Sequence, residues 1–211
     1  MSKISLKHSG GNVVSLNSPT SAPTSADVAF KLPNADGTSG QAIVTDASGN
    51  LSFAGTGKIL QVVSTTKTDT ASEAIAQGAI GSTDLISVSC AAASSSNRIL
   101  VIASIQMGMS SSASVGLSLF VGGSQSAYRG DAAGSRQRTS VWGRPGSNTR
   151  QYNFGLSYVV TSPSTSSTVY SIRGSHAHDA SQTVYLNYSE HSDSNYDART
   201  ASSITVMEIA A

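Results

Sequence analysis

The sequence predicts an all-β protein, on the basis of its low charge content, its short runs of alternating apolar residues and its frequent turn residues. Only 12% of the residues are charged, against about 25% in a typical soluble domain. Serine, threonine, glycine and alanine stand where charged residues would otherwise be. This composition suits short strands and tight turns better than long helices. We predict an extended N-terminal arm followed by a C-terminal antiparallel β-sandwich of the jelly-roll type.

Residues 1–57 contain apolar stretches that are too short to form a core of their own. They are separated by turn sequences such as Asp36–Gly37 and Ser48–Gly49–Asn50. Segments of this kind become stable when another surface completes their burial. We therefore predict that residues 1–57 form an attachment arm or short shaft, with an unstructured leader as the alternative. The apolar stretches are Ile4–Leu6, Val13–Leu16, Val28–Leu32, Ile43–Val44 and Leu51–Phe53.

Residues 58–211 contain longer runs that predict strands. The alternation of apolar and polar residues is clearest in 117–121 and 168–172, and the connecting segments are rich in Gly, Pro, Asn and Ser. Many strands at this spacing, without helices between them, favour an antiparallel sandwich or jelly roll. A weak helical signal covers 70–77. The expected strands are 59–66, 84–90, 98–109, 115–121, 137–142, 151–160, 168–174, 183–188 and 203–209.

The stretch Ile99–Ala103 contains no polar residue. A strand with this pattern is typically covered on both faces. In a domain of this size, one face would pack on the opposing sheet and the other on a neighbouring subunit. We therefore expect Ile99 and Val101 to lie in the core or in a subunit interface, and the chain to form a homo-oligomer.

The bulk properties of the chain argue against several classes of function. The net charge is +1, so the concentrated basic excess of a nucleic-acid-binding protein is missing. No stretch approaches the roughly 20 apolar residues that insertion into a membrane requires. Cys90 is the only cysteine, which excludes an intrachain disulfide, and we expect it to be a small buried residue. Residues 1–6 lack the apolar core of a signal peptide, so we expect folding in the cytoplasm.

Two parts of the chain resemble a known family. Residues 32–53 read LPNADGTSGQAIVTDASGNLSF and resemble the LP-x-x-DG-x-x-GQ segment of bacteriophage fibre proteins, especially those of phages of aquatic bacteria. Residues 57–63 and the terminal stretch 203–209, which ends in Met-Glu-Ile, are similar to the knob domain that often follows this segment. The resemblance implies a homotrimeric virion protein that is anchored by its N-terminus and exposes its C-terminal domain. We expect residues 1–57 to attach it to other virion proteins and the knob of residues 58–211 to bind the host surface.

The short chain leaves little room for a long shaft, which departs from typical tail fibres. A head fibre, or a capsid or neck decoration protein with no receptor role, is therefore the alternative. In either case we expect the protein to be located in the virion.

Five arginines and three aromatic residues alternate in one segment. Arginine beside aromatic rings suits anionic glycans or phosphate-bearing polymers, because it forms forked hydrogen bonds and stacks. The more conservative interpretation, favoured from the sequence, pairs the arginines with Glu190, Asp193 and Asp197 of other subunits and places Trp142 in the core. The candidate receptor-binding residues are Tyr128, Arg129, Arg136, Arg138, Trp142 and Arg144; the segment also holds Arg150, Tyr152 and a single acid, Asp131.

His176 and His178 form a His-x-His pattern. On a strand the two rings would share a face, and three copies around a threefold axis would offer six nitrogen ligands to a transition metal. The resemblance implies such a use, because fibre proteins bind metal in this way. The flanking residues 174–175 and 179–181 instead favour a solvent-exposed hairpin turn, which is the interpretation we prefer.

The remaining patterns do not predict catalysis or a cofactor. Residues 193–197 alternate oxygen ligands as a calcium loop does, but Ala198 and Ile204 stand where the pattern needs Gly and Glu. No G-x-S-x-G motif occurs, and the sequence brings no pair of carboxylates together. We therefore predict a protein that is not an enzyme.

Overall fold

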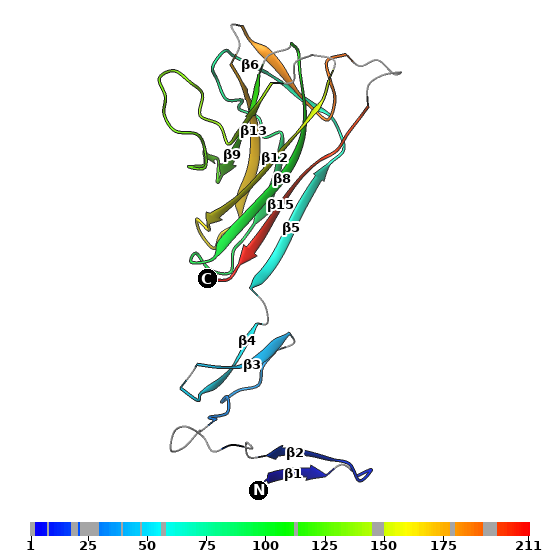
Figure 1. Cartoon of the computed structure of the whole chain (residues 1–211), viewed down its shortest axis with the longest axis vertical. Coiled ribbons are helices and arrows are strands. Elements are labelled where there is room, and N and C mark those ends of the chain that lie inside the picture. Colours follow the sequence, from blue (N-terminus) through cyan, green and yellow to red (C-terminus); the bar gives the residue numbers. More distant parts are fainter. Residues whose placement is uncertain are drawn as a thin grey trace. The chain divides into compact units, whose positions relative to one another are not determined.

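The computed structural model describes residues 3–7, 9–17, 21, 30–38, 40–46, 48–55, 58–111, 114–144, 150–177, 180–191 and 198–211. The chain divides into two compact units, Met1–Gly57 and Lys58–Ala211, which run from blue to cyan and from cyan to red in Figure 1. Across the described residues every named element is a β-strand, and every paired strand is antiparallel to its neighbour. The prediction of an all-β protein with antiparallel sheets is confirmed.

The first unit contains two separate hairpins. Strands β1 (Lys3–Lys7) and β2 (Val13–Asn17) form one, and β3 (Gln41–Thr45) and β4 (Leu51–Gly55) form the other. A two-stranded hairpin is at best marginally stable in water because it has no second layer to pack on. Large apolar side chains of this unit are accordingly exposed, among them Ile4 (68%), Leu6 (70%), Phe30 (66%), Leu32 (79%) and Ile43 (57%).

Asp46 closes the turn between β3 and β4. Its Oδ1 accepts hydrogen bonds from the backbone N–H groups of Ser48 (2.8 Å) and Asn50 (3.1 Å), and its Oδ2 accepts one from Asn50 Nδ2 (2.5 Å). The Asn50 side chain and the Ser48 N–H lower the pKa of Asp46, since both stabilise the carboxylate. Gly49 adopts φ +85° in this turn, a conformation that suits glycine.

The second unit consists of two antiparallel sheets. The five-stranded sheet has the order β10-β9-β13-β7, with β11 also paired to β9. The six-stranded sheet has the order β5-β15-β8-β14-β6, with β12 on the other side of β8. The strands are β5 (Ile59–Lys67), β6 (Ala71–Ile75), β7 (Ile86–Cys90), β8 (Arg98–Met109), β9 (Val115–Val121), β10 (Ser124–Gln125), β11 (Val141–Gly143), β12 (Tyr152–Thr161), β13 (Thr168–His176), β14 (Gln182–Leu186) and β15 (Ser202–Ile209).

A single core of apolar side chains lies between these two sheets. Successive side chains of a strand point to opposite faces, so every second residue enters the core. In β15, for example, Ile204 and Val206 are fully buried, while Thr205 and Met207 between them lie on the outer face. Ile99 and Val101 enter the same core from β8 and are fully buried.

Within a single chain, one face of β8 packs on the opposing sheet and the other face is not fully covered. In β8 only the face with Ile99, Val101 and Ala103 is buried, whereas Ile102 on the outer face is 40% exposed. The strand that is covered on both faces is β9, in which every residue from Val115 to Phe120 is buried. Any contact of β8 with another subunit would therefore involve its outward residues rather than Ile99 and Val101.

Two further expectations about local structure were wrong. The weak helical signal at 70–77 corresponds to β6, because Ala71, Glu73 and Ile75 alternate toward the interior and the strand pairs with β14. The expected strand 137–142 is mostly an irregular loop, and only Val141–Gly143 forms strand β11.

Candidate functional site

A pocket lies at the outer side of the five-stranded sheet, next to the loop of residues 126–140 that joins β10 to β11. Its volume is about 540 Å³, which is within the range of about 300–1,000 Å³ typical of small-molecule sites. The loop runs beside β9, as Figure 1 shows. The pocket is lined by Gly130, Arg136, Gln137, Thr139, Ser140, Val141, Trp142 and Ala177.

Trp142 fits beside β9 because position 116 has no side chain. Trp142 pairs with Gly116 across the two strands. A Cβ atom at Gly116 would lie 2.6 Å from Trp142 Cε3, 2.6 Å from Ser175 Oγ and 2.7 Å from Thr139 Cγ2, closer than real Cβ contacts. The bare backbone at Gly116 thus allows the indole, the Thr139 methyl group and the Ser175 hydroxyl to converge.

Ser140 fastens the loop to the sheet. Its Oγ donates to Tyr128 O (2.8 Å) and accepts from Leu119 N (3.1 Å), while its N–H donates to Leu117 O (2.9 Å). The hydroxyl of Tyr158 donates to Ser140 O (2.7 Å), and the rings of Tyr158 and Tyr128 lie 5.4 Å apart. These bonds tie both ends of the loop together, so the wall of the pocket is held in place before any ligand arrives.

Two arginines, Arg129 and Arg138, stabilise the conformation of the loop through hydrogen bonds. Arg138 Nε donates to Gly130 O (2.6 Å), and the Arg129 guanidinium donates to Gln125 Oε1. Gln125 Nε2 in turn donates to Arg138 O (2.8 Å). In the part of the chain that the structure describes, neither arginine pairs with a carboxylate, and the buried Arg129 Nε has no hydrogen-bond partner. The loop therefore carries two guanidinium groups that form no ion pair with a described carboxylate.

The structure brings two of the six candidate receptor-binding residues, Arg136 and Trp142, together in the pocket. Trp142 is 42% exposed, so its assignment to the core was wrong. Tyr128, Arg129 and Arg138 belong to the loop and support its shape.

Arg144, the sixth candidate, is exposed immediately after β11 and does not line the pocket. Among the carboxylates that the alternative interpretation invoked, Glu190 is exposed, while Asp193 and Asp197 lie outside the described residues. The ion pairs of the described residues, Lys67 with Asp69 and Arg173 with Asp84, do not involve Arg129, Arg136 or Arg138.

Of the pocket-lining residues, sequence reasoning identified only Arg136 and Trp142. Gly116, Gln137 and Ser140 are among the residues of the site that it missed. Gln137 Nε2 donates to Ala79 O (2.7 Å), which links the loop to the segment before β7. A glycine inside a strand pattern signals close approach of another group, so Gly116 was detectable in principle. Ser140 was not, because serines are abundant throughout the chain and only the fold distinguishes this one.

His176 does not lie in an exposed turn, which corrects the preferred interpretation of the His-x-His pattern. It is the last residue of β13, its exposed fraction is 0%, and its Nε2 is 2.7 Å from Ile75 O. A carbonyl can only accept, so Nε2 carries a proton and donates it to Ile75 O. Because the ring is enclosed within the unit, it is not available at the surface to form the proposed metal cage. His178 lies outside the described residues.

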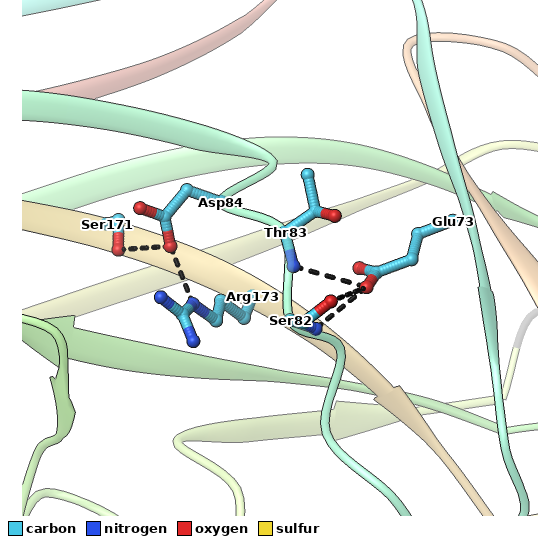
Figure 2. A network of polar contacts seen from close by, with 6 residues as sticks. All are labelled: Glu73, Ser82, Thr83, Asp84, Ser171 and Arg173. Carbon is cyan, nitrogen blue, oxygen red and sulfur yellow. Dashed lines mark hydrogen bonds and ion pairs between the residues drawn. The ribbon is translucent and has the colours of Figure 1, made fainter.

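A polar network joins the segment 82–84 to β6 and β13 (Figure 2). Arg173 Nε lies 2.6 Å from Asp84 Oδ1, which also accepts a hydrogen bond from Ser171 Oγ (2.8 Å). The Arg173 guanidinium lies 4.3 Å above the centre of the Phe120 ring. These groups satisfy one another, so we interpret this part of the network as structural.

Glu73 forms the other half of the same network. Its Oε1 accepts hydrogen bonds from Ser82 N (2.7 Å), Ser82 Oγ (3.1 Å) and Thr83 N (3.1 Å), as Figure 2 shows. One carboxylate oxygen thus fixes the backbone of the segment that leads into β7.

Glu208 is a fully buried carboxylate at the opposite end of β15 from Ser202. It accepts hydrogen bonds from Gln61 Nε2 (2.5 Å), Asn97 Nδ2 (2.6 Å) and Ala93 N (2.7 Å). Burial raises the pKa of Glu208, but these hydrogen bonds together outweigh that effect and leave the pKa below its ordinary value of 4.5. The ionised side chain therefore links β5, β15 and the loop after β7.

Cys90 is buried, as expected, with an exposed fraction of 4%. Burial, and to a smaller extent the nearby charge of Glu208, raises the pKa of its thiol. Tyr170 is buried close by, and burial raises its pKa to about 12, with smaller contributions from Cys90 and Glu208. Neither group is ionised near neutral pH, which fits a role in the core.

Among the described residues, no group of three or more His, Cys, Asp or Glu side chains is placed to hold a metal ion. The candidate calcium loop, 193–197, lies outside those residues. The same portion of the chain contains no helix that is long and apolar enough to cross a membrane. Neither a protein-family model nor a curated protein sequence matches this chain.

Proposed function

We propose that the protein is a short homotrimeric fibre of a bacteriophage particle, attached to other virion proteins by residues 1–57 and binding the host surface with a jelly-roll-like knob of residues 58–211. The resemblance of residues 32–53 to phage fibre proteins motivates the proposal. The observation that carries it is the exposure of the apolar side chains of the first unit. Leu32 and Leu6, at 79% and 70%, are examples.

Among the described residues of the first unit, no second sheet or helix covers these side chains. Each fully buried aliphatic side chain contributes roughly 1.5–3 kcal/mol to stability relative to an exposed one. Exposed side chains forgo this contribution, and neighbouring chains of a trimer or other particle proteins would supply the missing cover. An arm of this kind is suited to a structural role in an assembly.

The outer face of the six-stranded sheet supports the trimer. Strand pairing aligns Val62, Met207, Leu100 and Val159 in one row across β5, β15, β8 and β12. Val62 is 55% and Val159 41% exposed. An apolar row of this length on a sheet surface is typical of protein interfaces.

Sedimentation velocity of the full chain tests the assembly, with a trimer as the expected species. Val62→Asp should dissociate it because a charge would enter the row. Thr66→Asp, on the same face of β5 but among polar neighbours, is the matched control and should leave the trimer intact. A wild-type monomer at micromolar concentration would contradict the proposed trimer.

Antibody labelling of phage particles and binding of the labelled full chain to host cells test the function. The proposal requires label on the particle and saturable attachment to cells. Attachment to capsids without attachment to cells would instead support a decoration protein. Deletion of residues 1–57 should abolish incorporation into particles, and incorporation of the truncated chain would contradict the assignment of the arm.

A further inference from the structure

We infer that the pocket beside Trp142 binds an acidic sugar unit and that Arg136 selects its negative charge. This inference deepens the proposed host-binding function of the knob and rests on it. Three features of the pocket carry it: an exposed aromatic ring, a cation without a described acidic partner, and walls that are held in place by the fold.

Trp142 provides an apolar surface for a sugar ring. Its side chain is 42% exposed and lines the pocket, and Gly116 leaves room for the indole against β9. The flat apolar face of an aromatic ring can contact the C–H groups of a sugar ring, while polar groups around it can hydrogen-bond the sugar's hydroxyl groups. Tyr128, in contrast, already packs its ring on Tyr158.

The charge of the pocket favours an acidic ligand over a neutral one. Residues 128–152 contain five arginines and one aspartate, a net charge of 5 − 1 = +4. Arg136 lines the pocket and is exposed, and no ion pair within the described ranges involves it. Arg173 on the same sheet shows the opposite arrangement, since Asp84 neutralises it. A guanidinium without a partner can bind a carboxylate through two parallel hydrogen bonds.

The pocket has the size and rigidity that binding a small polar unit requires. Its volume of about 540 Å³ accommodates roughly one or two sugar rings. Ser140 holds the loop to β9, and Gln137 holds it to Ala79. Binding loses less conformational entropy when the walls are already fixed. The methyl group of Thr139 packs toward Gly116. The hydroxyl group of Thr139 therefore points in a different direction from Cβ.

Single-stranded nucleic acid also binds to aromatic rings and positive charges, but the pocket suits it less well than an acidic sugar. Such ligands follow a basic groove with several stacking rings. This pocket offers one exposed indole, and the whole chain has a net charge of only +1.

The test uses the full-length chain and the fluorescence of Trp142, which is the only tryptophan. The probes are tetragalacturonic acid and a hyaluronan tetrasaccharide, each compared with its carboxyl methyl ester, and an octathymidylate. We expect at least one acid to bind about tenfold or more tightly than its ester at low salt. The octathymidylate should bind more weakly than that acid.

Arg136→Gln should abolish the preference for the acid over its ester. Arg98→Gln, which changes an exposed arginine on the other sheet, is the matched control and should preserve it. Trp142→Ala, followed by calorimetry because its fluorescence is lost, should weaken both the acid and the ester. A normal unfolding curve for each variant establishes that the fold is intact.

Equal binding of acid and ester, binding of neither, tightest binding of the octathymidylate, or an unchanged preference in Arg136→Gln would each overturn the inference. The proposed function fails separately, if the wild-type chain does not attach to host cells. Saturable attachment to cells together with any of the four outcomes above would retain the function and reject the acidic-sugar pocket.

Discussion

Asn97 and Glu208, which are 111 positions apart in the chain, form a buried hydrogen bond of 2.6 Å between the amide Nδ2 and the carboxylate Oε1. Asn97 Oδ1 also accepts a hydrogen bond from Ala211 N (3.2 Å). The side chain of Asn97 thus links the loop before β8 to Glu208 in β15 and to Ala211, which follows that strand.

Replacement of Glu208 by Gln should lower the free energy of unfolding by about 2–3 kcal/mol, because an amide cannot accept from all the donors that surround the carboxylate. Urea unfolding followed by circular dichroism measures the loss. Asp131→Asn, which changes an exposed acid, serves as the control and should shift the midpoint little. Equal midpoints for both variants would show that the buried carboxylate contributes nothing.

Stability should depend on pH through Glu208. Its folded pKa is below the ordinary value of 4.5, so the ionised form stabilises the folded state. That contribution is fully present above about pH 4.5 and is lost as the pH falls through the folded pKa. Urea midpoints measured between pH 7 and pH 3 should therefore fall less steeply in Glu208→Gln than in the wild type. Parallel curves would contradict this assignment.

Gly116→Ala should disturb the pocket more than the rest of the fold. The added methyl group would lie 2.6 Å from Trp142 Cε3, so the indole must move, at a cost of about 1–3 kcal/mol. The emission maximum of Trp142 reports the displacement directly. Gly155→Ala is the control, because a Cβ there meets nothing within 4 Å. The same emission in both variants would rule out close packing at Gly116.

His176→Ala should destabilise the protein by about 2–4 kcal/mol, because it leaves a cavity in the interior. A solvent-exposed turn, the interpretation preferred from the sequence, would instead imply little change in stability. Ser181 Oγ also donates to Ile75 O (3.0 Å), so the carbonyl keeps a partner and the cavity dominates the cost. Thermal unfolding measures the effect, with the exposed His191→Ala as the control. An unchanged midpoint for His176→Ala would indicate that His176 is exposed at the surface and not buried.

The secondary structure was largely predictable because alternation is a local property. In β15 the pattern Ile204, Val206 inward and Thr205, Met207 outward can be read from the sequence and agrees with the burial. In β8 the pattern did not predict which face is buried, because apolar residues occupy both faces. Burial of an outward residue depends on what lies opposite, and the sequence carries no local signal for that.

The candidate site was predictable only in part. Arginine and tryptophan in one segment identified Arg136 and Trp142. Composition did not separate them from Arg138, which bonds Gly130 within the loop, or from Arg129, which bonds Gln125 of β10. The position of His176 was missed because neighbouring glycine and serine residues suggested a turn. In the fold, these small residues instead allow close packing around β13, as Gly174 does where a Cβ would lie 3.1 Å from Val184 Cγ2.

The enclosure of Cys90, the only thiol of the chain, makes the native protein inert toward maleimide dyes. A cysteine introduced at an exposed position away from the outer face of β5, such as Ser167 in the loop between β12 and β13, would then be the sole point of conjugation. Single-molecule photobleaching of that conjugate would count the copies in one particle-bound assembly, as the number of discrete intensity steps.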